Sequence, residues 1–175
     1  MRSILLFLFS GIIFSSCQVT VKKDEPSDNT SKSETNNSSS KIRNGILLNE
    51  NGLKVSSAYL SYEDGSLVSN ENSIDIGKKV IMHLKVSEWK VIDGKVYLGA
   101  GEKVSTSEGD VFLDEKDLFT TYDDSGVSAD DAESITLSAV ITQVSKIFDY
   151  FLVEFKVWDK RSNNSVSGSY KLYMN

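Results

Sequence analysis

The chain has 175 residues, which suits one domain with appendages, and its 39% hydrophobic and 25% charged residues are ordinary for a globular protein. It carries 19 basic against 25 acidic side chains, and this net charge of −6, without clustered Lys and Arg, argues against nucleic acid as a partner. The single cysteine excludes an internal disulfide, so the fold must be held by its core.

The first 17 residues have the pattern of a targeting segment. A positive end at Met1-Arg2 precedes an apolar run over 4–14, which is shorter than the roughly 20 residues that span a bilayer and is typical of a secretory signal. The stretch Phe14-Ser15-Ser16-Cys17 resembles the lipobox of bacterial lipoproteins, with Phe in place of the commoner Leu. The resemblance implies a signal peptide over residues 1–16 and acylation of Cys17, which would anchor the protein to a membrane.

The residues after Cys17 bear on where in the cell envelope the protein is located. Gln18, where an Asp would favour inner-membrane retention, points to the outer membrane of a Gram-negative bacterium. The run Lys22, Lys23, Asp24 and Glu25 resembles the export signal that some Gram-negative lineages use for surface lipoproteins. The same four residues also fit a solvated charge cluster in a linker, so the sequence leaves open whether the protein faces the periplasm or the cell surface.

The next segment is a predicted tether. Residues 26–40, "PSDNTSKSETNNSSS", contain no hydrophobic side chain, so they cannot bury enough apolar area to offset chain entropy. We therefore assign residues 17–43 to the lipidated Cys and a disordered tether, and residues 44–175 to one folded domain.

Alternating hydrophobicity predicts strands in the first half of that domain. The segment 52–62 alternates at Leu53, Val55, Ser57 and Tyr59, and 78–89 alternates more clearly. The pair Asp93-Gly94 favours a two-residue turn that would pair 85–92 with 95–99. A short apolar run over 109–113 is a further strand candidate.

The second half of the domain shows the same pattern. Strands are predicted over 134–144, 150–160 and 168–175, and the last two form a hairpin around the polar stretch "DKRSNNSVS". Helical signals are short: one turn over 114–119 and one over 128–133. In the second, Ser128 is a candidate N-cap and Asp131 completes a capping box.

These elements predict an all-β domain with about eight or nine strands and one or two short helical turns. We expect a single antiparallel β-sandwich, with a closed barrel as the alternative. The pattern resembles immunoglobulin-like domains only in general arrangement, because their Cys…Trp…Cys spacing is absent. No function follows from that likeness.

The sequence shows no catalytic signature, and we expect no enzyme activity, cofactor or metal. His83 is the one histidine and lies mid-strand between lysines. Glu115-x-Asp117 resembles part of the acid motif of sandwich-fold glucanases, but Thr120 stands where that motif needs a third acid. The acidic loop 122–133 could supply oxygen ligands to calcium, although it does not fit the EF-hand register, and the sequence leaves this open.

Four residues of the terminal hairpin form a candidate binding patch. Alternation leaves Trp158 and Tyr173 on the face opposite the core, beside Lys156 and Lys171, although the two aromatics could also cover apolar surface or pair across strands. The predicted function is a lipid-anchored, non-catalytic envelope module that acts through protein–protein contacts with an unknown envelope protein. The alternative is a small carbohydrate-binding, or less readily glycan-hydrolysing, surface lipoprotein.

Overall fold

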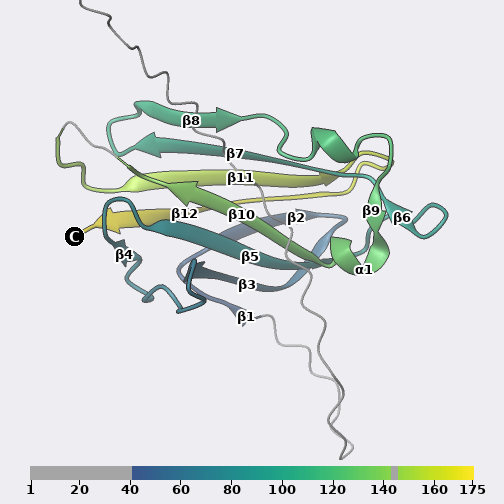
Figure 1. The fold of residues 1–175 in the computed structure, drawn as a ribbon, viewed down its shortest axis with the longest axis horizontal. Coiled ribbons are helices and arrows are strands. Elements are labelled where there is room, and N and C mark those ends of the chain that lie inside the picture. The colour runs from purple at the N-terminus through teal and green to yellow at the C-terminus, as the bar shows by residue number, and fades with distance from the viewer. Residues whose placement is uncertain (1–40, 143–145) are drawn as a thin grey trace, which may run out of the picture.

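The computed structural model describes residues 41–142 and 146–175, which form a sandwich of two β-sheets (Figure 1). The prediction of an all-β sandwich is confirmed. The predicted signal peptide, Cys17, the Lys22–Glu25 run and the tether as far as residue 40 lie outside the described residues. Within the described residues no helix has the length and apolarity needed to cross a membrane.

One layer is a four-stranded sheet. The strand order is β1-β3-β5-β10, and the long neighbours pair antiparallel. Its strands are β1 (Lys41–Ile42), β3 (Lys54–Tyr62), β5 (Lys79–Ser87) and β10 (Ser134–Val140).

The other layer is a six-stranded sheet. Its path is β2-β12-β11-β7-β8, and β4 pairs with the end of β12. Its strands are β2 (Leu47–Asn51), β4 (Ser73–Ile74), β7 (Leu98–Thr106), β8 (Val111–Glu115), β11 (Phe151–Asp159) and β12 (Ser165–Met174).

The remaining elements are short and gather at one end of the sandwich, on the right in Figure 1. A two-stranded ribbon pairs β6 (Lys95–Val96) with β9 (Val127–Ser128). The helical elements are η1 (Thr120–Tyr122) and α1 (Ala129–Ala132). The Ser128 side chain accepts from the Asp131 backbone N–H, so the predicted N-cap is present. The Asp131 carboxylate accepts from the Ser128 hydroxyl and not from the Ser128 backbone N–H, so the predicted capping box is only half formed. The helical turn expected over 114–119 is displaced to η1, because β8 extends to Glu115.

The strand count and directions differ from the prediction in the short elements. Twelve strands form within residues 41–142 and 146–175, of which β1, β4, β6 and β9 have two residues each, leaving eight longer ones. β1 and β4 pair parallel with β3 and β12, so the sandwich is antiparallel only among its longer strands. Because β1 begins at Lys41, strand pairing starts before residue 44, where the sequence placed the domain boundary.

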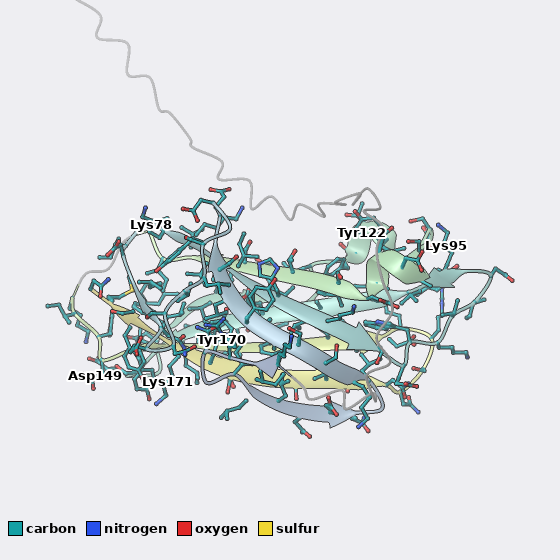
Figure 2. All side chains as sticks on the ribbon, turned by 90° about the horizontal axis from the view of Figure 1, so that it is seen from below. Lys78, Lys95, Tyr122, Asp149, Tyr170 and Lys171 are labelled. Carbon is teal, nitrogen blue, oxygen red and sulfur yellow. The ribbon has the colours of Figure 1, made fainter. Side chains whose placement is uncertain are left out.

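The core lies between the sheets and follows the predicted alternation in most strands. Phe151, Val153, Phe155 and Val157 of β11 are buried, as are alternate residues of β5 and β10. Figure 2 shows Tyr170 between the layers, while its neighbour Lys171 lies outside. The 29 buried hydrophobic residues form one continuous cluster.

Strand β3 corrects one predicted face. The pairing of β3 with β5 shifts between Val55 and Ser57, as expected for a β-bulge. The extra residue reverses the alternation, so Ala58 and Leu60 face the core instead of the predicted Ser57 and Tyr59.

The Asp93-Gly94 turn forms, but it does not join two long strands. Ile92 and Lys95 exchange backbone hydrogen bonds of 2.9 Å across it, and both turn residues have positive φ. Beyond that bridge the chain separates, because β5 pairs with β3 and β10 while β7 pairs with β11 and β8. The predicted pairing of 85–92 with 95–99 is therefore limited to one bridge.

The final hairpin is longer than predicted. β11 and β12 pair from Phe151 opposite Leu172 to Trp158 opposite Ser165. Residues 165–167, expected in the loop, belong to β12. The turn is correspondingly shorter, and the outward side of β12 gains two serines.

Candidate binding face

The outer face of the six-stranded sheet is the side turned away from the four-stranded layer, and it carries the candidate site. Along β11 the outward residues are Leu152, Glu154, Lys156 and Trp158. The register places small residues on both sides of this row. Gly101 and Gly99 of β7 lie opposite Lys156 and Trp158, and Ser167 and Ser165 of β12 lie opposite the same two residues on the other side.

Trp158 is held flat against the sheet by Gly99. A Cβ added at Gly99 would collide with the indole ring, so only glycine lets the ring lie on the β7 backbone. The residue is partly buried. The result is an aromatic surface that is fixed in orientation and partly accessible to solvent.

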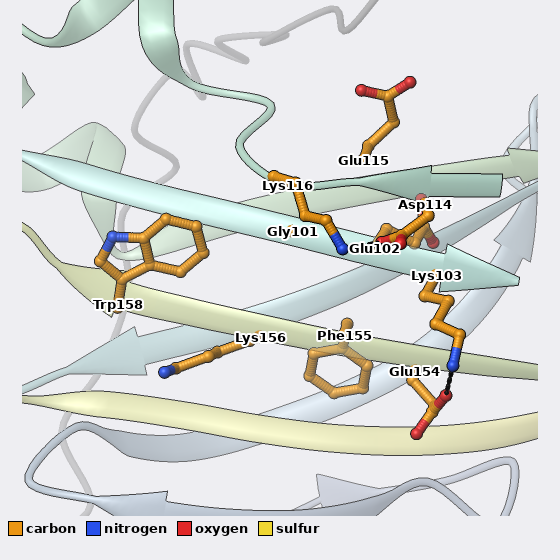
Figure 3. A pocket seen from close by; sticks show the side chains of 10 residues that line it. All are labelled: Gly101, Glu102, Lys103, Asp114, Glu115, Lys116, Glu154, Phe155, Lys156 and Trp158. Carbon is orange, nitrogen blue, oxygen red and sulfur yellow. Dashed lines mark hydrogen bonds and ion pairs between the residues drawn. The ribbon is translucent and has the colours of Figure 1, made fainter.

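A first hollow of about 490 Å³ lies beside this indole, over strands β8, β7 and β11 (Figure 3). Gly101 lets the backbone at the end of β8 lie close against β7, because a Cβ at Gly101 would lie 2.8 Å from the Lys116 carbonyl oxygen. Figure 3 shows Trp158 at one end of the hollow and the Lys103–Glu154 ion pair at the other. Its lining residues are Gly101, Glu102, Lys103, Asp114, Glu115, Lys116, Glu154, Phe155, Lys156 and Trp158.

The charges around the first hollow balance one another. Lys103 Nζ lies 3.3 Å from a Glu154 carboxylate oxygen, and Lys116 Nζ lies 2.6 Å from Asp114. Lys156 and Glu115 complete three cations and three exposed carboxylates. The side chains of Glu102 and Phe155 are buried on the opposite face, so these two residues contribute their backbone. The hollow is therefore polar without a strong net field.

A second hollow of about 270 Å³ lies at the other end of the same hairpin. Its aromatic member, Tyr173, is 40% exposed. The Tyr173 ring packs edge to face on the Tyr150 ring, with the two ring centres 6.4 Å apart. The Lys171 ammonium lies 3.8 Å from the centre of the Tyr150 ring, a cation–π contact. Leu152, Ser169 and Glu71 also line this hollow.

The four residues of the predicted patch share the outer face, but they form two pairs. Trp158 and Lys156 line the first hollow, while Tyr173 and Lys171 line the second. Ser165 pairs with Trp158, and Tyr173 lies eight residues further along β12. At about 3.3 Å per residue the two aromatics are about 26 Å apart.

Sequence reasoning missed the small residues that shape this face. Gly99 and Gly101 alternate on β7, and Ser165, Ser167 and Ser169 alternate on β12. The segments "LGAGEK" and "SVSGS" do carry a signal for it, because small residues at every second position of a strand lie on the same face. Their meaning depends on which strands flank β11, and a single sequence does not give that order.

His83 lies on the outer face of the other sheet. Its ring stacks on Tyr59 with centroids 4.6 Å apart, and its Nε2 lies 2.8 Å from Ser61 Oγ. Burial lowers the pKa of His83. Among the described residues no carboxylate hydrogen-bonds to this ring, so no acid orients the imidazole as in a catalytic triad.

Three of the acids singled out in the sequence, Asp117, Asp123 and Asp131, have structural partners. Asp117 accepts a hydrogen bond from the Phe119 backbone N–H at 2.9 Å and pairs with Lys160 at 2.6 Å. Lys160 also pairs with Asp123 in the acidic loop, and Asp131 accepts from the Ser128 hydroxyl at 2.6 Å. In the part of the chain that the structure describes, no group of three His, Cys, Asp or Glu side chains is placed to hold a metal.

Two buried polar groups face the core of the same sheet. Glu102 is only 3% exposed, and burial raises its pKa to about 7. Tyr170 is also buried, and burial together with the nearby Glu102 raises its pKa well above the ordinary value. Neither the Glu102 Oε1 nor the Tyr170 hydroxyl has a hydrogen-bond partner among the described residues. Alternation in the last predicted strand places Tyr170 on the same face as Leu172, but no pattern in the sequence points to Glu102.

In comparisons with known proteins, neither a family model nor a curated sequence matches this chain. Among solved structures, the chain is similar to the C-terminal domain of Wzt, with a TM-score of 0.47 and 12% sequence identity. The similarity covers 78% of this chain and 81% of that chain. A likeness at this level carries no argument about function, so function is inferred from the residues of the outer face.

Proposed function

We propose that this protein is a non-catalytic glycan-binding module of a bacterial envelope, held to the outer membrane by a lipid on Cys17. The observation that carries the glycan assignment is the first hollow, in which a partly exposed indole, fixed by its packing on Gly99, stands beside a polar rim. The lipid anchor and the address rest on the lipobox resemblance and on Gln18.

The first hollow suits a sugar because it offers two kinds of contact side by side. A sugar ring has an apolar C–H face and a rim of hydroxyl groups. The indole of Trp158 supplies a flat apolar surface, and Lys156, Glu154 and Asp114 supply donors and acceptors around it. The paired charges keep the surface nearly neutral, so neither a strongly anionic nor a strongly cationic partner is favoured.

The pairing of the carboxylates supports binding without catalysis. Glycoside hydrolysis needs two carboxyl groups facing one sugar, one of which acts as a proton donor. In the first hollow Asp114 and Glu154 are neutralised by lysines, and the acid with a raised pKa, Glu102, is turned into the core. These residues favour recognition over bond cleavage.

The test is binding of the full-length protein and its Trp158→Ala variant to an array of neutral and charged glycans. We expect the wild type to retain neutral glycans and the variant to lose affinity about tenfold or more, since the indole supplies the stacking surface. Tyr59→Ala removes an aromatic from the outer face of the other sheet and should bind like wild type. Thermal melts of all three proteins check that folding is kept.

The proposal fails if the folded wild type retains no glycan on the array. A pull-down from envelope extract then tests the second candidate, a protein-binding module. The exposed edge of β8 favours that candidate, because Val111 is 54% and Phe112 49% exposed there. A partner protein that is retained by wild type and lost on Phe112→Ser would support it.

A further inference from the structure

We infer that the ligand is a chain of several neutral sugars, bound lengthwise along the outer face from Trp158 to Tyr173. This inference rests on the proposed function and extends it from one hollow to a track. It assigns a role to the second hollow, which the glycan proposal above does not use.

The two hollows are neighbours on one strand face. Glu154 lines the first and Leu152 lines the second, and these residues are consecutive outward positions of β11. Two residues along a strand span about 7 Å, so the two hollows are lined by positions about 7 Å apart along β11. A ligand that leaves the first hollow along β11 therefore enters the second.

An aromatic side chain stands at each end of this path. Trp158 closes the first hollow and Tyr173 lies in the second, about 26 Å away by the register of β12. A single sugar ring is much smaller than this span, so a ligand that reaches both aromatics has to be an oligomer.

The path between the ends is kept low by small side chains on its β12 side, while the Lys103–Glu154 ion pair stands on its β7 side. Ser165, Ser167 and Ser169 run beside β11 on its β12 side and present short hydroxyl side chains. No large side chain of β12 rises between Trp158 and Lys171 on this face. A chain lying along β11 would meet hydroxyls on one flank, which match the hydroxyl-rich edge of a polysaccharide.

Charge balance in both hollows favours a neutral chain. The first hollow has three lysines and three exposed carboxylates, and the second has Lys171 and Glu71. An anionic polymer would meet a carboxylate for each lysine, so it would gain little from these cations. We therefore expect affinity to change less than about twofold when NaCl rises from about 0.05 M to about 0.3 M.

The experiment is titration calorimetry of the full-length protein with oligosaccharide ladders from the disaccharide to the octasaccharide. The probes are maltose-, cellulose- and chitin-derived ladders, together with a ladder of any neutral glycan retained on the array. We expect affinity to rise about tenfold or more with length and then level off, with one long chain bound per protein. Tyr173→Ala should weaken the octasaccharide about tenfold and the disaccharide less than about twofold.

The outcomes separate this inference from the proposed function. If short sugars bind as well as long ones, or if Tyr173→Ala leaves the octasaccharide unchanged while Trp158→Ala abolishes it, the glycan site stands and the track is wrong. If two long chains bind independently, the hollows are separate sites and the track is again wrong. If nothing binds at any length, the glycan function itself fails. Tyr59→Ala is the matched aromatic control, expected to behave as wild type throughout.

Discussion

Glu102 shows at the residue scale how a buried acid sets a pH dependence. Its side chain faces the core beside Tyr170, and burial raises its pKa from the ordinary 4.5 to about 7. A carboxyl with a raised pKa binds its proton more tightly in the folded state than in the unfolded chain. Its contribution to stability is therefore full below about pH 4.5 and is lost as the pH rises to about 7.

The corresponding prediction concerns Glu102→Gln, which keeps the shape and removes the charge. At pH 8 we expect the variant to be more stable than wild type by about 2–3 kcal/mol, because the wild type then holds an ionised carboxylate in the core. At pH 4 the two proteins should be nearly equal. Denaturant unfolding at both pH values measures this, and Glu154→Gln on the exposed outer face is the matched control. Equal stability of Glu102→Gln and wild type at pH 8 would show that the Glu102 carboxylate is solvated.

At the scale of elements, a pair of buried asparagines joins the two sheets. Asn44 has a positive φ of 57° and accepts a hydrogen bond from the Leu60 backbone N–H of β3 at 2.9 Å. Its amide donates to the side chain of Asn72, also at 2.9 Å. Asn72 in turn donates to the Lys171 carbonyl of β12 at 2.8 Å. Two loop residues thus connect a strand of each layer.

We predict that Asn44→Ala destabilises the fold by about 3 kcal/mol. The substitution leaves the buried hydrogen-bond partners of Asn44 unsatisfied, and alanine lacks the polar side chain that lets asparagine tolerate a positive φ. Asn44→Gly should lower the free energy of unfolding slightly less, since glycine accepts a positive φ without strain. Denaturant unfolding measures both, and Asn49→Ala, exposed on β2, should change stability by less than about 0.5 kcal/mol. A change below about 1 kcal/mol on Asn44→Ala would contradict a joining role.

The strands also show where pattern reasoning stops. Period-two alternation identified the buried faces of β5, β10 and β11, because each has one face against the core. It failed in β3, where the bulge after Val55 reverses the alternation, and the two serines that follow Val55 give no apolar signal to mark it. The two-residue strands β1, β4, β6 and β9 are too short to show any period.

At the scale of the whole molecule, the proposal joins a membrane anchor to a binding face. The labelling of cells with radioactive palmitate tests the anchor. We expect the wild type to incorporate label and Cys17→Ala to lose it, because the lipobox resemblance places the acyl chains on that cysteine. Equal labelling of the two would remove the lipid from the proposal. It would leave the glycan site untouched, since the first hollow is lined by residues between Gly101 and Trp158.

The sequence by itself determined the all-β class, the terminal hairpin and the outward direction of Trp158, Lys156, Lys171 and Tyr173. These are properties of alternation within single strands, and burial on one face enforces them. Only the tertiary structure decided that the four residues form two pairs about 26 Å apart, because their separation depends on the register of β11 against β12. It also decided that Gly99 and Gly101 lie beside Trp158 and Lys156, since β7 becomes the neighbour of β11 through contacts distant in sequence. The candidate site is thus a product of strand order, which local patterns do not encode.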